Sequence, residues 1–142
     1  MRAATLLRLL FFLLAACGAP EVALEKLPPP AGASGEVVIL RPSAFIGDEG
    51  AYVVNVDQRN VHSMEAKERI QLRLGAGAHR IALRCWQMAL AEWKETAITH
   101  DVVAGTTSYL RVVPRHSCAE LEPLTEREAR SLAVGTAFKP LQ

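Results

Sequence analysis

The chain has 142 residues, 50% of them hydrophobic, with 16 basic and 15 acidic side chains and a formal net charge of +1. This length suits one domain with a short extension. Two of the basic residues, Arg2 and Arg8, lie in the first 16 residues, and without this segment the formal charge is −1. A balance this close to neutral excludes the basic field by which proteins bind nucleic acids or anionic lipids through charge alone.

The first residues follow the pattern of a secretory signal peptide. Arg2 lies near the start, and Arg8 directly precedes the apolar run Leu9–Leu14. Small residues follow this run. The run is much shorter than the roughly 20 residues of a membrane-spanning helix. At its end, Leu14-Ala15-Ala16-Cys17 resembles the lipobox of bacterial lipoproteins, in which diacylglycerol is attached to the cysteine and cleavage occurs just before it. We therefore expect a lipoprotein signal peptide over residues 1–16 and a lipid on Cys17. The alternative is an ordinary secretory signal with Cys17 incidental.

Residues 17–35 are expected to connect the lipid to the domain. The run Pro28-Pro29-Pro30 and the small residues Gly32–Gly35 favour an extended and flexible tether, which would hold the domain some tens of ångströms from the lipid at ~3 Å per residue. Acyl chains hold a protein firmly in a membrane, because each methylene group buried in the lipid contributes ~0.8 kcal/mol to the free energy of binding. Gly18 after the cysteine resembles lipoproteins sent to the outer membrane. We expect a cell-envelope location, on the outer membrane facing the periplasm.

Residues 36–142 carry the pattern of a mainly β domain. Seven segments are apolar or alternate apolar and polar residues between turn signals. They are Val37–Leu40, Ala51–Val56, Val61–Met64, Ile70–Leu74, Arg80–Cys85, Thr96–Val103 and Thr107–Val113. Near the end, Thr125 and Glu128 have the spacing of a capping box, and Gly135 is a stop signal. The sequence predicts a small antiparallel β-sandwich of about seven strands with one short C-terminal helix.

Two cysteines remain if Cys17 is acylated. Cys85 and Cys118 are an even number in an oxidising compartment, so we expect them to form a disulfide. Such a bond would close a loop of about 33 residues and add about 3–4 kcal/mol to stability. The alternative, a reactive or metal-binding thiol pair, is disfavoured because neither residue lies in a Cys-X-X-Cys or zinc-ligand spacing.

Two tryptophans flank the least regular segment of the domain. Trp86 and Trp93 cover the core in the simplest interpretation, because large aromatic side chains in small domains are mostly buried. If they are exposed, they form with Arg84 and Lys94 an amphipathic contact patch for a protein, a glycan or peptidoglycan.

The sequence offers no pattern for catalysis, a cofactor or a metal. The histidines fall on separate predicted elements: His62, His79, His100 and His116. A metal shared by His116 and Cys118 would need further ligands that the sequence does not supply. No Gly-X-Ser-X-Gly motif or phosphate-binding glycine loop is present. We expect no enzyme activity, no cofactor and no metal.

Several pieces occur in order along the domain, with turns between them. They are Val38–Pro42 with Gly47, Tyr52–Asp57, Leu74–Gly77 with His79, and Ala104-Gly105 followed by Tyr109–Val112. Together they resemble a family of bacterial lipoprotein domains of unknown function, similar in strand pattern to PEGA-type modules and other small β-sandwiches. The resemblance implies architecture and an envelope location.

These features lead to an expected function. The first hypothesis is a lipid-anchored, non-enzymatic accessory or protein-interaction module of the cell envelope. The second is an envelope ligand-binding lipoprotein for a glycan or small molecule, and the third is an envelope hydrolase without a recognisable motif. The expected partners are the membrane, through the N-terminal lipid, and an envelope protein or glycan, with no nucleic acid.

Overall fold

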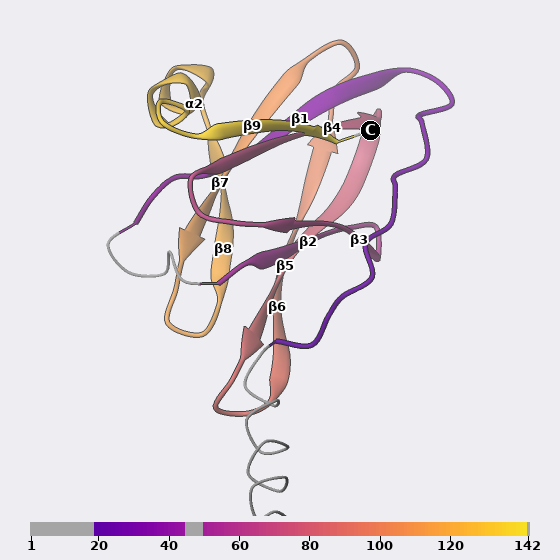
Figure 1. Cartoon of the computed structure of the whole chain (residues 1–142). Helices are drawn as coiled ribbons and strands as arrows, with labels where there is room; N and C mark the ends of the chain where they lie inside the picture. The colour runs from indigo at the N-terminus through magenta and orange to yellow at the C-terminus, as the bar shows by residue number, and fades with distance from the viewer. Residues whose placement is uncertain (1–18, 45–49, 142) are drawn as a thin grey trace, which may run out of the picture.

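The structure, a computed structural model, describes residues 19–44 and 50–141. Within these ranges it has nine strands and one helix (Figure 1). The strands are β1 (Ser34–Arg41), β2 (Tyr52–Val56), β3 (Arg59–Met64), β4 (Glu68–Gly75), β5 (Gly77–Gln87), β6 (Glu92–Val102), β7 (Thr107–Pro114), β8 (Ala119–Leu124) and β9 (Ala137–Leu141), and the helix is α2 (Glu126–Leu132). Sheet A has the order β8-β7-β1-β4-β9, and sheet B has the order β3-β2-β5-β6.

The two sheets pack face to face because each has one apolar face. Alternate residues of a strand point to the same side, so Val37 and Ile39 of β1 enter the core from sheet A. Ile81 and Leu83 of β5 enter it from sheet B, and all four side chains are fully buried. The predicted small β-sandwich is confirmed in its two sheets, its mainly β content and its single short helix among the described residues.

The structure has two strands more than the seven that the sequence predicts. β8 contains Glu120, Glu122 and Pro123, and β9 contains Pro140, so neither has a clean apolar alternation. Both are edge strands, where proline is tolerated because one side of the strand has no hydrogen-bonding neighbour.

Two strand pairings differ from the antiparallel arrangement that the sequence predicts. β1 pairs with β7 in parallel, and β4 pairs with β9 in parallel. Both pairs join strands that are distant in sequence, and α2 lies in the connection that brings the chain back to β9. Such long connections permit parallel pairing, whereas the local hairpins β2–β3 and β5–β6 are antiparallel.

The segment before β1 lies along the domain, and we call residues 19–33 the strap. The amide of Glu25 donates to the carbonyl of Asn60 on β3 at 2.7 Å, and Leu27 packs against the core. In Figure 1 the indigo chain starts beside the β5–β6 hairpin and runs along the side of the sandwich to the end where β1 begins. The flexible, stand-off tether that the sequence predicts for residues 17–35 therefore does not describe the strap, because Leu27 has apolar surface to cover.

The helix begins and ends where the local signals predict. The hydroxyl of Thr125 accepts a hydrogen bond from the amide of Glu128, and the carboxylate of Glu128 accepts one from the amide of Thr125 at 2.8 Å. Gly135 has a φ of 79°, in the left-handed region that glycine adopts most readily. Ala129 is the buried residue by which α2 contacts the sandwich.

Candidate functional site

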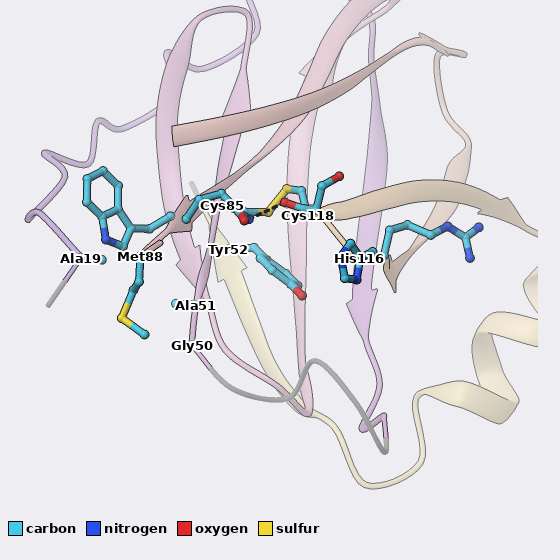
Figure 2. A pocket seen from close by; sticks show the side chains of 12 residues that line it. Ala19, Gly50, Ala51, Tyr52, Cys85, Met88, His116 and Cys118 are labelled. Carbon is cyan, nitrogen blue, oxygen red and sulfur yellow. Dashed lines mark hydrogen bonds between the residues drawn. A yellow bond between two sulfur atoms is a disulfide. The ribbon is translucent and has the colours of Figure 1, made fainter. Parts of the chain in front are cut away.

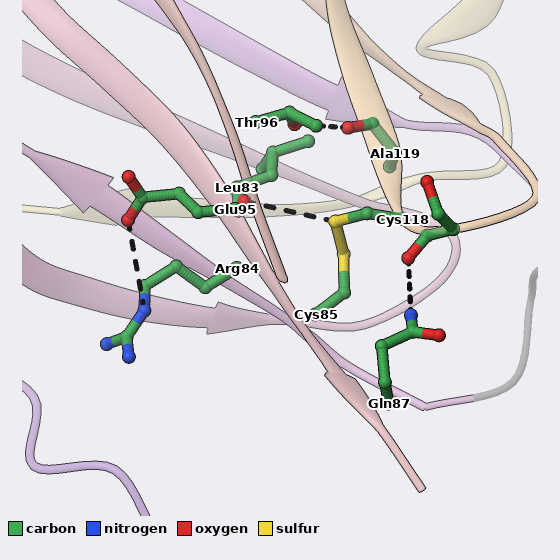
Figure 3. Close-up of a disulfide and its surroundings, with 9 residues drawn as sticks. Leu83, Arg84, Cys85, Gln87, Glu95, Thr96, Cys118 and Ala119 are labelled. Carbon is green, nitrogen blue, oxygen red and sulfur yellow. Dashed lines mark hydrogen bonds and ion pairs between the residues drawn. A yellow bond between two sulfur atoms is a disulfide. The ribbon is translucent and has the colours of Figure 1, made fainter. Parts of the chain in front are cut away.

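Cys85 and Cys118 are joined by a disulfide across the sandwich (Figure 3). Cys85 lies near the end of β5 in sheet B, and Cys118 lies just before β8 in sheet A, with their Cα atoms 5.5 Å apart. Both side chains are buried. The sequence predicts this disulfide, and the structure shows that it links one sheet to the other.

Two side-chain hydrogen bonds support the disulfide. The hydroxyl of Thr96 donates to the carbonyl of Ala119, and the amide of Gln87 donates to the carbonyl of Ser117. Thr96 and Gln87 belong to the β5–β6 hairpin, and their acceptors lie on either side of Cys118. The start of β8 is therefore held to sheet B by a covalent bond and by polar contacts.

The predicted contact patch is brought together except for one member. Trp86 and Trp93 face each other across β5 and β6 in an edge-to-face contact, with ring centroids 5.4 Å apart. The guanidinium of Arg84 lies 5.1 Å from the centroid of Trp93. Both indoles are partly exposed and lie outside the core cluster. We call Arg84, Trp86 and Trp93 the aromatic patch.

Lys94 does not join this patch. It follows Trp93 directly, so its side chain points to the opposite face of the hairpin. There it forms an ion pair with Glu92, with 2.8 Å between Nζ and the carboxylate oxygen. Lys94 was grouped with the tryptophans because it is close to them in sequence. The alternation of side chains along a strand places it on the other face.

A polar recess adjoins the aromatic patch on the outer face of sheet B. Its volume is about 380 Å³, and it is lined by Asn55, Gln58, Asn60, Arg80, Arg84 and Glu95. The amide of Asn55 and the guanidinium of Arg84 both donate to Oδ1 of Asn60 at 3.1 Å. Asn55 is only 5% exposed, and its own Oδ1 accepts no hydrogen bond from any group that the structure describes.

A second recess, of about 390 Å³, lies at the end of the sandwich near the disulfide (Figure 2). Its lining includes both cysteines, Tyr52, Trp86, Met88 and His116. Ala19, the first residue that the structure describes, is also part of its wall. The strap therefore begins beside the tip of the β5–β6 hairpin.

The candidate ligands for metals are dispersed. His62 contacts Glu68 and His100 contacts Ser108, whereas His116 is exposed beside the second recess. Over the described ranges, no group of three or more His, Cys, Asp or Glu side chains is arranged to hold a metal ion. No helix in the same ranges is long and apolar enough to cross a membrane. Cys17, the predicted lipid site, lies outside the described residues.

Glu68 is a buried charge that the sequence does not indicate. Glu68 is 3% exposed and accepts hydrogen bonds from the amide of Glu65 at 3.1 Å and from Lys139 of β9, and it contacts Nε2 of His62 at 2.9 Å. Burial raises the pKa of this carboxyl, but the bonds from Lys139, His62 and Glu65 outweigh burial and leave its pKa below the ordinary value. This carboxylate helps to fix β9 to β4.

Asp57 and His79 form a polar cluster at the β2–β3 turn. Asp57 and Gln58 both have positive φ, 47° and 70°, as a tight two-residue hairpin turn requires. One carboxylate oxygen of Asp57 accepts from the amide of Arg80 at 2.9 Å, and the other lies 2.6 Å from Nδ1 of His79. Nε2 of His79 lies 2.8 Å from the carbonyl of Gly75. Burial lowers the pKa of His79, but the contacts with Asp57 and Gly75 outweigh it, and the pKa is raised.

A pH-dependent contribution to stability follows. Because the pKa of His79 is higher in the folded chain, its contribution is complete below the ordinary pKa of 6.5 and is lost as pH rises through the folded value. His79→Gln should lower the free energy of unfolding below pH 6.5, by less than about 1 kcal/mol since Asp57 is half exposed, and the difference should shrink at alkaline pH.

Urea unfolding at two pH values measures this difference. The control is His116→Gln, at an exposed position beside the second recess. The neighbouring His100 has a pKa lowered mainly by burial, and it is present in both the wild type and the variant, so its titration does not by itself produce a difference between them. A difference for His79→Gln that grows at alkaline pH would contradict the prediction.

Comparison with models of known protein families, with curated protein sequences and with solved structures finds no match to this chain.

Proposed function

We propose that this chain is a lipid-anchored protein of the bacterial cell envelope, whose β-sandwich is a non-enzymatic accessory or protein-interaction module. The observation that carries the envelope assignment is the bond between Cys85 and Cys118, because disulfides form and persist in oxidising compartments outside the cytoplasm. The pattern Leu14-Ala15-Ala16-Cys17 supports a lipid anchor at the start of the mature chain. The resemblance to lipoprotein β-sandwich modules agrees with both.

The outer face of sheet B is the proposed surface for a protein partner. Most residues of β6 are exposed or partly exposed, and the aromatic patch lies at one end of this face. Tryptophan and arginine contribute most often to the energetic centres of protein interfaces. The stacked arrangement of Arg84 and Trp93 is already formed in the free domain, so its side chains lose little further freedom on binding.

In-cell crosslinking tests this surface. A photo-crosslinking amino acid at Ala97, which is exposed on the same face of β6 as Trp93, should capture a defined envelope protein. The same probe at Val134, which is 84% exposed beyond α2, is the matched control. Adding Trp93→Ala should reduce the yield at Ala97, since loss of a central interface tryptophan costs about 2 kcal/mol or more in binding. Equal products from both positions, or no product from Ala97, would count against the module.

The polar recess favours a second candidate function, the binding of a glycan. Oδ1 of Asn55 is a buried acceptor without a described partner, and a ligand hydroxyl supplies the donor that it lacks. Trp93 lies next to the recess, because Arg84, which lines the recess, contacts the Trp93 ring. Calorimetric titration with soluble peptidoglycan fragments tests this candidate, with Asn55→Ala as the variant expected to lose binding. If the wild-type domain gives no heat of binding, the glycan-binding function is contradicted and only the protein-interaction role remains proposed.

A further inference from the structure

The tip of the β5–β6 hairpin is unusually apolar for an exposed turn. It consists of residues 88–91, which we call the hairpin tip, and its sequence is Met-Ala-Leu-Ala. Met88 is 72% exposed and Leu90 is 64% exposed. Exposed turns generally consist of glycine, proline and small polar residues. The hairpin tip instead presents two large hydrophobic side chains to its surroundings.

The backbone holds these side chains outward. The amide of Leu90 donates to the carbonyl of Gln87 at 3.2 Å, and the amide of Ala91 donates to the carbonyl of Met88 at 3.4 Å. Ala91 closes the turn with a φ of 48°, a left-handed conformation that is uncommon for a residue with a side chain. β5 and β6, each of 11 residues, carry the tip beyond the body of the sandwich.

The start of the mature chain lies at the same place. Ala19 lines the second recess together with Trp86 and Met88, and Figure 2 shows Ala19 next to Met88. The strap uses the following residues to reach the far end of the sandwich, so they provide no slack between the domain and the membrane. Only two residue steps separate Ala19 from Cys17, which limits the distance between their Cα atoms to about 7 Å.

We infer that the hairpin tip inserts into the lipid bilayer beside the acylated Cys17, so that the domain rests on the membrane with this end down. The inference rests on the lipid anchor of the proposed function. The occupant is a bilayer because the chain leads to acyl chains at this end. Since the anchor already holds the tip at the surface, two apolar side chains meet the lipid at a high effective concentration. Trp86 then lies at the level of the headgroups, where indole rings are favoured.

The orientation has a consequence for the partner surface. The polar recess lies further along sheet B, around Asn60 and Arg80. With the tip in the lipid, the outer face of sheet B stands upright at the membrane and faces sideways. A partner anchored in the same membrane can then reach it without a long tether.

Site-specific fluorescence tests the insertion. The full mature protein, purified with its lipid, is reconstituted in vesicles of phosphatidylethanolamine and phosphatidylglycerol. An environment-sensitive nitrobenzoxadiazole probe is attached at Leu90→Cys, and at Val134→Cys as the matched control, since Val134 is 84% exposed and lies beyond α2. The Leu90 probe should show a several-fold rise in fluorescence with a blue shift on vesicles, and the Val134 probe should not change.

The outcomes separate the inference from the anchor on which it rests. In one outcome, the acylated protein binds the vesicles but the probes at Leu90 and Val134 both remain in an aqueous environment. This result would contradict the insertion and would be consistent with the lipid anchor. Protein that carries no acyl group on Cys17 would overturn both.

A second variant avoids added probes. Met88→Ser with Leu90→Ser changes only exposed side chains, so its melting temperature should match the wild type. Brominated lipids should quench the two tryptophans of the chain less in this variant. Equal quenching would contradict the insertion.

Discussion

Replacing both Cys85 and Cys118 with alanine is expected to lower the free energy of unfolding by about 4 kcal/mol. The bond closes a loop with a sequence separation of 33, and opening a loop of this size frees the unfolded chain by about that amount in the chain-entropy model. The bond also joins sheet B to the start of β8 in sheet A, so its loss removes a covalent cross-link between the two layers. β8 stays paired with β7, but its contact with sheet B then depends on the hydrogen bonds from Thr96 and Gln87, so this contact should become the weakest between the two sheets.

Urea denaturation measures this effect, with reductant as the internal control. The oxidised wild type should have the highest midpoint, and the reduced wild type should fall close to the double variant. The double variant itself should not respond to reductant. A wild type whose midpoint is the same with and without reductant would show that the pair adds nothing to stability.

Gly35→Ala is expected to destabilise the protein by about 3 kcal/mol, at the upper end of the cost of overpacking. A Cβ at Gly35 would lie 2.5 Å from the carbonyl oxygen of Val103 and 3.0 Å from that of Thr106. These backbone atoms belong to the β6–β7 turn, which is hydrogen-bonded to the start of β1 through the amide of Gly105 and the carbonyl of Ser34 at 2.9 Å. The turn therefore cannot move aside without breaking its own bonds.

Gly32→Ala is the matched control for this substitution. A Cβ at Gly32 would meet no atom within 4 Å. Both changes restrict the unfolded chain equally, so the difference between them isolates the clash at Gly35. Thermal unfolding should show a large drop for Gly35→Ala and little change for Gly32→Ala. Equal melting temperatures would contradict the close approach of β1 and the β6–β7 turn.

The sequence predicted those elements whose signals are local. The helix α2 follows from a capping box of four consecutive residues, and the β4–β5 region follows from apolar alternation around Gly75-Ala76-Gly77. β8 and β9 could not be found in this way, because edge strands can contain proline and charged residues. The position of the strap depends on whether Leu27 finds apolar surface in the folded domain, which is not visible in a proline-rich segment.

The candidate site was also predicted only in part, because the sequence shows local signals and does not show which distant residues come together. Counting cysteines was sufficient to pair Cys85 with Cys118, and tryptophan content pointed to Trp86 and Trp93. The sequence does not indicate the role of Asn55, because an asparagine inside an apolar strand gives no sign of a buried acceptor. The exposure of the hairpin tip depends on how far β5 and β6 extend. The sequence does not predict this, because the segment between the tryptophans has no regular pattern.

Mass spectrometry of the protein isolated from cell membranes tests the central claim most directly. The lipid-anchor account predicts a mature chain whose first residue is Cys17, with a mass increase corresponding to a diacylglycerol group on its sulfur, and complete loss of this species in Cys17→Ala. A chain that retains residues 1–16, or that carries Cys17 without lipid, would contradict the account.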